Sequence, residues 1–371
     1  MTDEVLERMI ATYMATDQPT YSFGWQGGEP TLMGVDFFRR ITELEQRCGR
    51  PGAMVANGLQ TNATLITDEM AAHLGEYSFL VGVSIDGPSA VHDRYRRTVD
   101  GRGSLKAVLK GLDHLKRNKV EYNVLILVSA ANVERPAETY DYVNSLGARF
   151  HQYIPCVEFD QQGRRLPFAI NGKQWGDFLC GVFERWIRRD TRQVSIRLFD
   201  SVLTLMVEGH PSVCYMDRNC CQYFVVEHNG DVYPCDFFVE KELLLGNVMH
   251  GEWRDFLESP VYKDFGRRKS RFNEECADCE YLEYCAADCP KQRFYGTQDP
   301  TQRSFLCEGW KAFYSRTLPE FRRLAGDIRR ERELEYRRRS LSTGVPEKLP
   351  RPNDPCYCGS GRKFKHCHGR L

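Results

Sequence analysis

The sequence predicts an α/β protein whose first half forms a parallel sheet and whose second half has a different, cysteine-rich architecture. Two observations support this prediction. Residues 1 to about 210 alternate short apolar strands with amphipathic helices. Nine of the fifteen cysteines then lie between Cys214 and Cys307, where that alternation stops. Strand–helix alternation is typical of a parallel sheet with right-handed crossovers, either a barrel or a doubly wound fold.

The strands are expected at six short apolar runs, which are Tyr21–Gln26, Gly58–Thr61, Leu80–Ile85, Tyr122–Val128, Phe150–Ile154 and Ser195–Leu198. Helical spacing of apolar residues predicts helices at 35–48, 67–76, 104–118, 133–146 and 174–190. Thr67 is a good N-cap for the second of these, because Asp68 and Glu69 follow it in the first turn.

Polar and glycine-rich segments follow three of the strands, at residues 26–30, 60–62 and 84–87. In a barrel, chemistry takes place at the carboxyl ends of the strands. Gly27 and Gly28 provide a backbone that a ligand can approach closely. Exposed backbone groups and Glu29 could hold the ammonium of an amino-acid moiety. The alternative is an ordinary turn that is capped by Glu29 and Pro30.

Composition excludes several classes of function. Lys and Arg together balance Asp and Glu at 51 each among 371 residues, so no overall charge favours nucleic acid or anionic lipid. No apolar run approaches the roughly 18 residues of a membrane span. The first fourteen residues are charged and amphipathic, without the apolar core of a signal peptide. Fifteen cysteines in such a chain favour a reducing cytoplasm.

The cysteine spacing indicates metal binding. One block reads Cys214-x5-Cys220 and continues to Cys235, and the other reads Cys276-x2-Cys279-x5-Cys285-x3-Cys289, with Cys307 eighteen positions later. Thiolates are soft ligands, and four of them hold an iron–sulfur cube, so eight make two complete sets. Two structural zinc sites are the main alternative, because C-x2-C pairs also bind zinc. Disulfides would need an oxidising compartment.

The second half also contains smaller units. Val225–His228 and Asp231–Tyr233 predict a hairpin with an Asn-Gly turn, directly before Cys235. Residues 311–340 predict a charged, solvated helix, and 341–352 a linker. In the tail, 353–371, three thiolates and an imidazole would form a closed zinc site, from Cys356, Cys358, Cys367 and His368. Its basic residues suggest a knob that binds a protein partner.

Six segments carry a resemblance to a known family: WQGGEPTLMG (25–34), LQTNAT (59–64), VSIDGPSAVHDRYR (83–96), QYIPCVE (152–158), VVEHNGDVYPCDFFV (225–239) and the block from Cys276 to Cys307. With them the sequence closely resembles the anaerobic sulfatase-maturating enzymes, which are S-adenosylmethionine radical enzymes with a C-terminal SPASM cysteine domain. The tail resembles the SEC-C zinc motif of the SecA translocase.

The resemblance implies a partial (β/α)6 TIM-type barrel over 1–210 that lacks its first strand, followed by a SPASM domain over 211–310. It implies two auxiliary [4Fe–4S] clusters. Cluster I matches Cys214, Cys220, Cys235 and Cys289, and cluster II matches Cys276, Cys279, Cys285 and Cys307. Cys221 is then a spare buried thiol.

The resemblance also implies roles for residues at the carboxyl ends of the strands. Contacts to S-adenosylmethionine match Gly28, Ser84, Arg96 and Val157, beside Gly27 and Glu29. The peptide substrate is expected at Gln26 and Tyr153. Arg96 is chemically suited to the methionine carboxylate, and Asp236 matches the catalytic base.

The implied reaction is oxidation of a cysteine or serine in a sulfatase polypeptide to formylglycine. An electron donor such as flavodoxin or ferredoxin would be a partner. The tail's relatives dock partner proteins.

One motif of the family is missing from the sequence. Radical enzymes of this class hold a third cluster with a C-x3-C-x2-C loop, which the family places shortly before the segment matching residues 1–10. The first cysteine here is Cys48, isolated like Cys156 and Cys180. A start placed too far downstream, a truncated gene, and loss of radical chemistry are the three explanations. The last would leave a module that binds a peptide or partner. A SPASM peptide maturase with another substrate is a further alternative.

Overall fold

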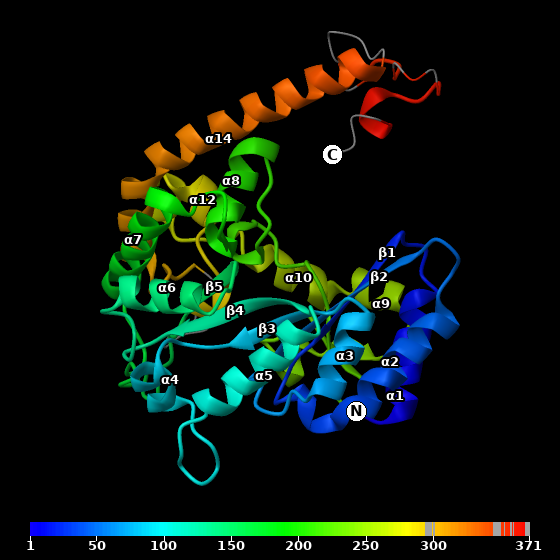
Figure 1. Ribbon diagram of the computed structural model, residues 1–371. Coiled ribbons are helices and arrows are strands. Elements are labelled where there is room, and N and C mark those ends of the chain that lie inside the picture. The colour runs from blue at the N-terminus through cyan, green and yellow to red at the C-terminus, as the bar shows by residue number, and fades with distance from the viewer. Residues whose placement is uncertain are drawn as a thin grey trace.

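The computed structural model describes residues 1–293, 299, 301–343, 350–351, 353–356, 358 and 360–367 (Figure 1). Six parallel strands form one sheet in sequential order, β1 (Thr20–Trp25), β2 (Met54–Thr61), β3 (Leu80–Ser84), β4 (Glu121–Val128), β5 (Phe150–Pro155) and β6 (Ser195–Ile196). In a doubly wound fold the strand order reverses direction. The sequential order therefore supports the incomplete barrel over the doubly wound alternative.

Eight helices accompany this sheet: α1 (Asp3–Met14), α2 (Gly34–Cys48), α3 (Asp68–Glu76), α4 (Ser89–Tyr95), α5 (Leu105–Arg117), α6 (Pro136–Ser145), α7 (Gly172–Arg189) and α8 (Arg197–Glu208). Strand β1 shows how they divide the sheet into two faces. Tyr21, Phe23 and Trp25 are buried, whereas Ser22 and Gly24 between them are exposed. Side chains alternate across a strand, so one face packs on helices and the other face is open.

One strand was predicted too long. The expected strand Ser195–Leu198 ends at Ile196, and Arg197 and Leu198 begin α8. Leu198 and the following Phe199 are buried on that helix. Apolar side chains in so short a run fit the buried face of a strand or of a helix. Helix α8 is an element that the sequence did not predict. The helix predicted at 133–146 begins later, at Pro136, which fits the first turn of a helix.

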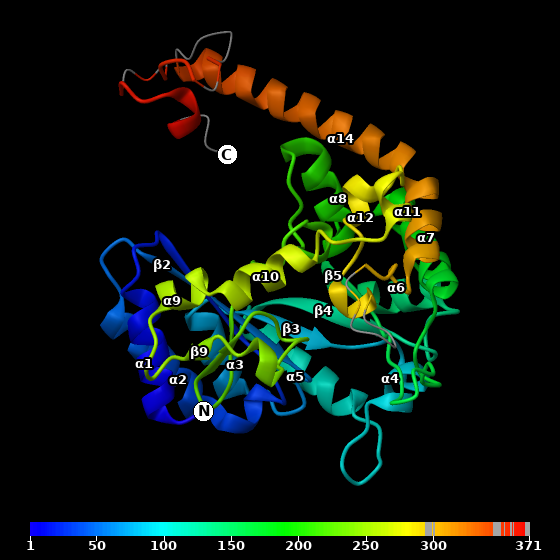
Figure 2. The same ribbon diagram turned by 180° about the vertical axis from the view of Figure 1, so that it is seen from behind.

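The second half consists of short elements. A three-stranded antiparallel sheet is formed by β7 (Val225–Val226), β8 (Asp231–Tyr233) and β9 (Gly246–Asn247). Its first two strands are the expected hairpin, with Gly230 at a φ of 90° in the turn. The helices that surround it are α9 (Trp253–Glu258), α10 (Pro260–Arg268), α11 (Glu274–Ala277), α12 (Leu282–Cys285) and α13 (Pro290–Arg293). Figure 2 shows α9 and α10 in front of the strands of the large sheet.

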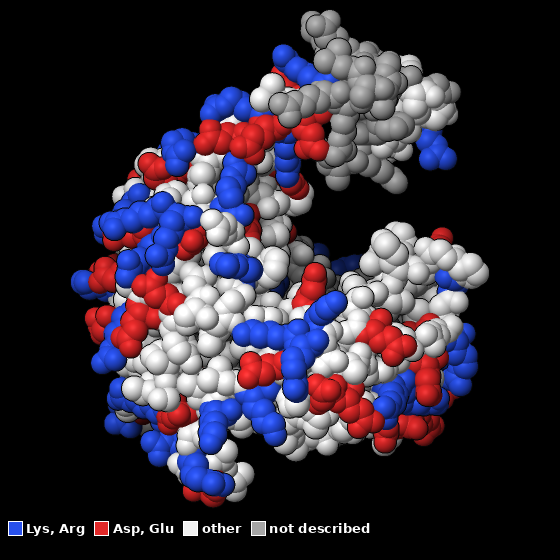
Figure 3. All heavy atoms as spheres, in the orientation of Figure 1, with Lys and Arg blue, Asp and Glu red and all other residues white. Residues whose placement is uncertain are grey.

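The last long helix, α14 (Cys307–Thr343), contains the predicted charged segment and begins four residues before it. Its first turns pack closely on α7, where a Cβ on Gly309 would lie 2.1 Å from the carbonyl oxygen of Gly172. The C-terminal part projects from the body as an arm, and Figure 3 shows an open notch beneath it. No helix in the described ranges is both long and apolar enough to span a lipid bilayer.

Candidate catalytic and cluster sites

The loop after β1 is fixed by the carboxylate of Glu29. Its Oε1 accepts hydrogen bonds from the hydroxyls of Thr31 and Thr61, both at 2.6 Å, and its Oε2 accepts one from the backbone N–H of Asn62 at 2.8 Å. The carboxylate thus joins the end of β1 to the end of β2. Its contacts are those of the capped turn that the sequence offered as the alternative to a ligand contact.

Gly27 and Gly28 leave the backbone of this loop open. Their φ angles are 105° and 56°, in the left-handed region that favours glycine. A Cβ on either residue would meet no atom within 4 Å. The loop therefore offers a backbone edge that a ligand can approach closely, as the sequence predicts.

Arg96 lies where β3 and β4 end. Its Nε donates to Asp86 Oδ2 at 2.6 Å and its Nη2 to Asp86 Oδ1 at 3.2 Å. The same Oδ1 accepts a hydrogen bond from the backbone N–H of Leu127 at 2.9 Å. Ser84 ends β3, and Val157 is buried just beyond β5. Parallel strands end at one edge of a sheet, so these residues and the glycine loop share the same edge.

Asp236 lies where the two halves of the chain meet. Its Oδ2 accepts a hydrogen bond from Gln26 Nε2 at 3.0 Å, and its Oδ1 accepts one from the hydroxyl of Tyr223 at 2.9 Å. The thiol of Cys235 lies 3.5 Å from the same Oδ1. A carboxylate beside Cys235, a cysteine assigned to cluster I, is thus held by one residue from the barrel and one from the cysteine-rich half.

Tyr223 is a site residue that the sequence analysis missed. Partial burial and the neighbouring Cys235 and Asp236 raise the pKa of its phenol well above the usual range. Tyr223 is therefore protonated and donates its hydrogen bond to the carboxylate. Its position thirteen residues before Asp236, across the hairpin, was the available signal.

Tyr153 does not join this group. It is buried, its ring packs edge-on against Phe178 of α7 with centroids 5.5 Å apart, and its hydroxyl lies 3.3 Å from His151 Nδ1. The side chain therefore belongs to the layer between the sheet and the helices. A contact with a peptide substrate remains a prediction for this position.

The four cysteines assigned to cluster I come from separate segments. Cys220 and Cys235 pack against one small apolar cluster, formed by Phe238, Leu243 and Phe265. Burial raises the pKa of Cys220 to about 11, with further contributions that include the nearby Cys214. Burial raises the pKa of Cys289 well above its usual value, with smaller contributions in the same direction from Asp288 and Cys220.

The four cysteines assigned to cluster II line a single pocket. Cys276, Cys279, Cys285 and Cys307 share it with Tyr281, Leu282, Ala287, Trp310 and Lys311. None of the chain's fifteen cysteines, all of which are described, forms a disulfide. The spare thiol, Cys221, lies outside both sets, where its Sγ donates to the carbonyl of Tyr262 at 3.3 Å. The donor sets therefore fit iron–sulfur clusters, because thiolates are the ligands that such clusters use.

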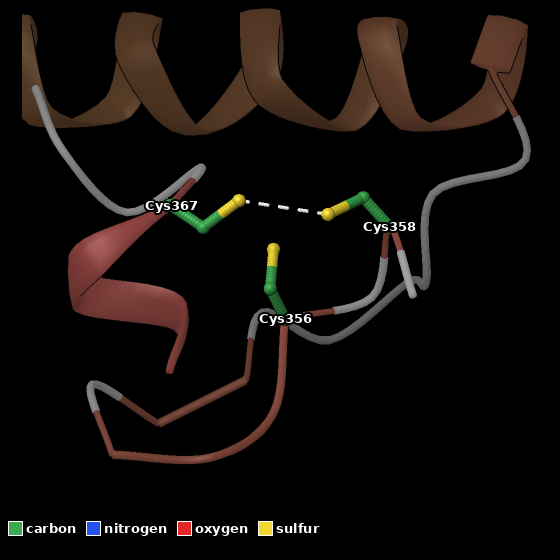
Figure 4. Close-up of side chains that lie close together, drawn as sticks. All are labelled: Cys356, Cys358 and Cys367. Atoms are coloured by element: carbon green, nitrogen blue, oxygen red, sulfur yellow. Dashed lines mark hydrogen bonds between the residues drawn. The ribbon is translucent and has the colours of Figure 1, made fainter. Parts of the chain in front are cut away.

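The tail brings three of its four predicted zinc ligands together. The Sγ atoms of Cys356, Cys358 and Cys367 all lie within 4.8 Å of one another, and those of Cys358 and Cys367 are 3.5 Å apart (Figure 4). This spacing fits thiolates around a single tetrahedral ion. The fourth predicted ligand, His368, lies outside the described residues.

Three family models match the chain. They are the Radical SAM superfamily at residues 1–143, the SPASM iron–sulfur cluster-binding domain at 214–280 and the SEC-C motif at 353–370. Together with the parallel sheet and the two cysteine sets, they define a radical S-adenosylmethionine protein with an iron–sulfur SPASM domain. Iron–sulfur clusters and S-adenosylmethionine are the cofactors of this class.

The relatives narrow this class further. The chain is 35% identical to the serine-type anaerobic sulfatase-maturating enzyme of Bacteroides thetaiotaomicron, over 86% of this chain and 81% of that protein. It is 32% identical to the cysteine-type enzyme of Clostridium perfringens, over 89% and 90%. The solved structure of native anSMEcpe with bound AdoMet and the Cp18Cys peptide superposes with a TM-score of 0.84 at 32% identity, covering 88% and 92% of the two chains. The chain belongs to the anaerobic sulfatase-maturating enzyme family.

Proposed function

We propose that this protein oxidises a cysteine or serine side chain of a sulfatase polypeptide to formylglycine. The observation that carries the proposal is the setting of Asp236, whose carboxylate is held by Gln26 and Tyr223 beside Cys235. Similar enzymes act on both serine-type and cysteine-type sulfatases. Asp236 lies between the strand ends that would hold S-adenosylmethionine and the proposed cluster ligand Cys235. A base in this position suits an oxidation that removes a proton as well as an electron.

The oxidation removes a hydrogen atom, a proton and an electron from the substrate side chain. A serine then becomes the aldehyde directly, whereas the thioaldehyde formed from a cysteine must exchange its sulfur for the oxygen of water and release hydrogen sulfide. When bound, S-adenosylmethionine and the iron–sulfur clusters would supply the radical chemistry and take up the electron. Asp236 accepts the proton from the substrate thiol or hydroxyl. Gln26 and Tyr223 each donate to one oxygen of that carboxylate, so they orient it before the substrate arrives. Preorganised donors of this kind need no rearrangement during the reaction.

The cofactor contacts follow the predicted residues. Gly27 and Gly28 would receive the amino-acid end of S-adenosylmethionine along their open backbone, and Ser84, Arg96 and Val157 would line the same edge. Arg96 would turn part of its guanidinium from Asp86 toward the methionine carboxylate. Glu29 would act through the loop that it fixes. The ligand sets are proposed as Cys214, Cys220, Cys235 and Cys289 for cluster I, and Cys276, Cys279, Cys285 and Cys307 for cluster II.

The remaining assignments concern the tail and the surroundings. We assign one zinc ion to Cys356, Cys358, Cys367 and His368, in a closed site without a catalytic position. The tail would bind a protein partner, and a flavodoxin or ferredoxin would exchange electrons with the clusters. Fifteen cysteines without a disulfide suit a reducing cytoplasm. The boundaries proposed for the units are 1–210, 211–310, 311–340, 341–352 and 353–371.

A two-part experiment tests the proposed function. The 371-residue chain, reconstituted anaerobically, should bind about eight irons and a sulfatase-derived peptide. A form extended by a C-x3-C-x2-C segment read from the upstream frame should convert the peptide residue to formylglycine, detected by mass spectrometry. Asp236→Asn should abolish conversion without releasing iron. Asp231→Asn, in the neighbouring hairpin, should leave conversion intact. Conversion by Asp236→Asn at the unaltered rate would refute the role of this carboxylate.

A further inference from the structure

A lysine is fully buried between the two cysteine sets. Lys269, directly after α10, has no exposed surface. Its Nζ donates to three backbone carbonyl oxygens, those of Tyr215 at 3.0 Å, Ala286 at 3.2 Å and Asp288 at 2.7 Å. An ammonium has three donors, so this geometry uses all of them.

The three carbonyls belong to residues next to proposed cluster ligands. Tyr215 follows Cys214, Ala286 follows Cys285, and Asp288 precedes Cys289. The segment between Cys285 and Cys289 links the two sets through three successive residues at positive φ, Ala286 at 45°, Ala287 at 58° and Asp288 at 66°. Residues with a Cβ rarely adopt this left-handed conformation, because it is sterically strained. The lysine bonds help to hold this strained connection in place.

No carboxylate among the described residues pairs with this ammonium. Asp288, whose carbonyl oxygen accepts one of these bonds, uses its carboxylate elsewhere. Its Oδ2 accepts from Ser304 Oγ at 2.7 Å and Trp310 Nε1 at 2.8 Å, and its Oδ1 accepts from the backbone N–H of Cys289. A second buried cation, Arg293, lies beside the lysine and donates from Nη2 to its carbonyl oxygen at 2.8 Å. Buried charges are costly unless an opposite charge compensates them.

Lys269 thus contacts the backbone beside both cysteine sets. Two of its three carbonyl partners adjoin ligands assigned to cluster I, Cys214 and Cys289, and the third adjoins Cys285, which is assigned to cluster II. The positive charge therefore lies beside both cysteine sets, with more of its bonds at the set for cluster I (set I) than at the set for cluster II (set II).

We propose that Lys269 is a positioning and charge-compensating residue that joins the two cluster sites. It raises the reduction potentials of both clusters, and it raises the potential of the cluster at set I more than that of the cluster at set II. The inference rests on the cluster assignment in the proposed function. A cluster gains one negative charge when an electron reduces it. A nearby buried ammonium stabilises that added charge, so an uncharged side chain there makes reduction harder.

Two matched variants test this inference without measuring turnover. Lys269→Met removes the buried charge with little change in length, and Lys263→Met removes an exposed lysine from α10, the helix that ends just before Lys269. Each chain is reconstituted anaerobically, assayed for iron and sulfide, and titrated with dithionite while EPR follows the reduced clusters. We expect full iron in both. In Lys269→Met the ratio of reduced to oxidised cluster at set I should fall at least tenfold at a fixed potential, which is 59 mV for one electron.

The outcomes separate the inference from the proposed function. Unaltered potentials in an iron-loaded Lys269→Met would overturn the inference and leave the cluster assignment intact. A wild-type chain without iron would overturn the proposed function itself. If Lys269→Met folds poorly or loses iron, Lys269→Arg and Lys269→Gln decide, because both donate hydrogen bonds and only arginine is charged. More iron in the arginine variant supports the charge, and equal or less iron refutes it.

Discussion

A buried acid on helix α2 gives the sharpest prediction for the barrel. Glu45 of α2 is 6% exposed, and its Oε2 accepts a hydrogen bond from Asn57 Nδ2 of β2 at 2.9 Å. Asn57 Oδ1 in turn accepts one from Trp25 Nε1 of β1 at 2.8 Å. Glu45 Oε1 is buried without a partner among the described residues. This series of hydrogen bonds connects α2 to β1, which leads into the glycine loop, and to the neighbouring strand β2.

Burial raises the pKa of Glu45 from 4.5 to about 7, against the opposing hydrogen bond from Asn57. A carboxyl group whose pKa is raised by folding favours the neutral form in the folded state. Its contribution to stability is present below pH 4.5 and is lost as the pH rises through 7. The difference between 4.5 and about 7, at about 1.4 kcal/mol for each pKa unit, corresponds to about 3 kcal/mol. Glu45→Gln, which stays neutral, should avoid this loss.

Urea unfolding of the wild type and of Glu45→Gln across about pH 4 to pH 9 measures the effect. The free energy of unfolding of the variant, relative to the wild type, should rise by about 3 kcal/mol over this range. Glu43→Gln, on the exposed face of the same helix, is the control and should show little dependence on pH. A difference between Glu45→Gln and the wild type that stays constant with pH would refute the reasoning.

Three further predictions concern the site and the tail. Tyr223→Phe removes the donor to Asp236 Oδ1. A charge-assisted bond at this partly exposed position is worth about 1–2 kcal/mol, so the rate of formylglycine formation should fall roughly 5- to 30-fold. Tyr233→Phe is the control. Cys289→Ser should lower bound iron by about four per chain, whereas Cys221→Ser, outside both sets, should leave iron content unaltered. Cys356→Ser should release zinc from the tail with the iron retained, measured by elemental analysis.

Much of the barrel could be predicted because its signals are local. Each strand is an apolar run, and strands joined by helices take neighbouring places in the parallel sheet in sequence order. The error at Arg197 and Leu198 arose where a two-residue strand passes directly into a buried helix, so no polar turn marks the boundary. Helix α14 was found in its charged part, but its first turns lie in the core and lack that charge pattern.

The site was less accessible to sequence reasoning, because its contacts join distant segments. Gln26 and Asp236 are 210 residues apart, and only the docking of the two halves brings them together. Lys269 has no neighbour in the sequence that reveals its burial. Glu29 is a further case. Thr31, Thr61 and Asn62 donate hydrogen bonds to its two oxygens, which the sequence did not reveal, and the ligand contact expected for this carboxylate stays a prediction.

The position of the proposed base therefore depends on how the two halves pack. Besides the bond between Gln26 and Asp236, Trp253 Nε1 of α9 donates to Thr12 Oγ1 of α1 at 2.9 Å. Arg8 Nε donates to the carbonyl of Val248 at 3.2 Å, next to β9 of the small sheet. Helix α1 thus contacts the residues just after β9, and β9 pairs with β8, the strand that leads to Cys235 and Asp236. Productive geometry for proton transfer tolerates little displacement. Loosening the contact between α1 and the residues after β9 should therefore lower the rate of conversion and leave the amount of bound iron nearly unaltered.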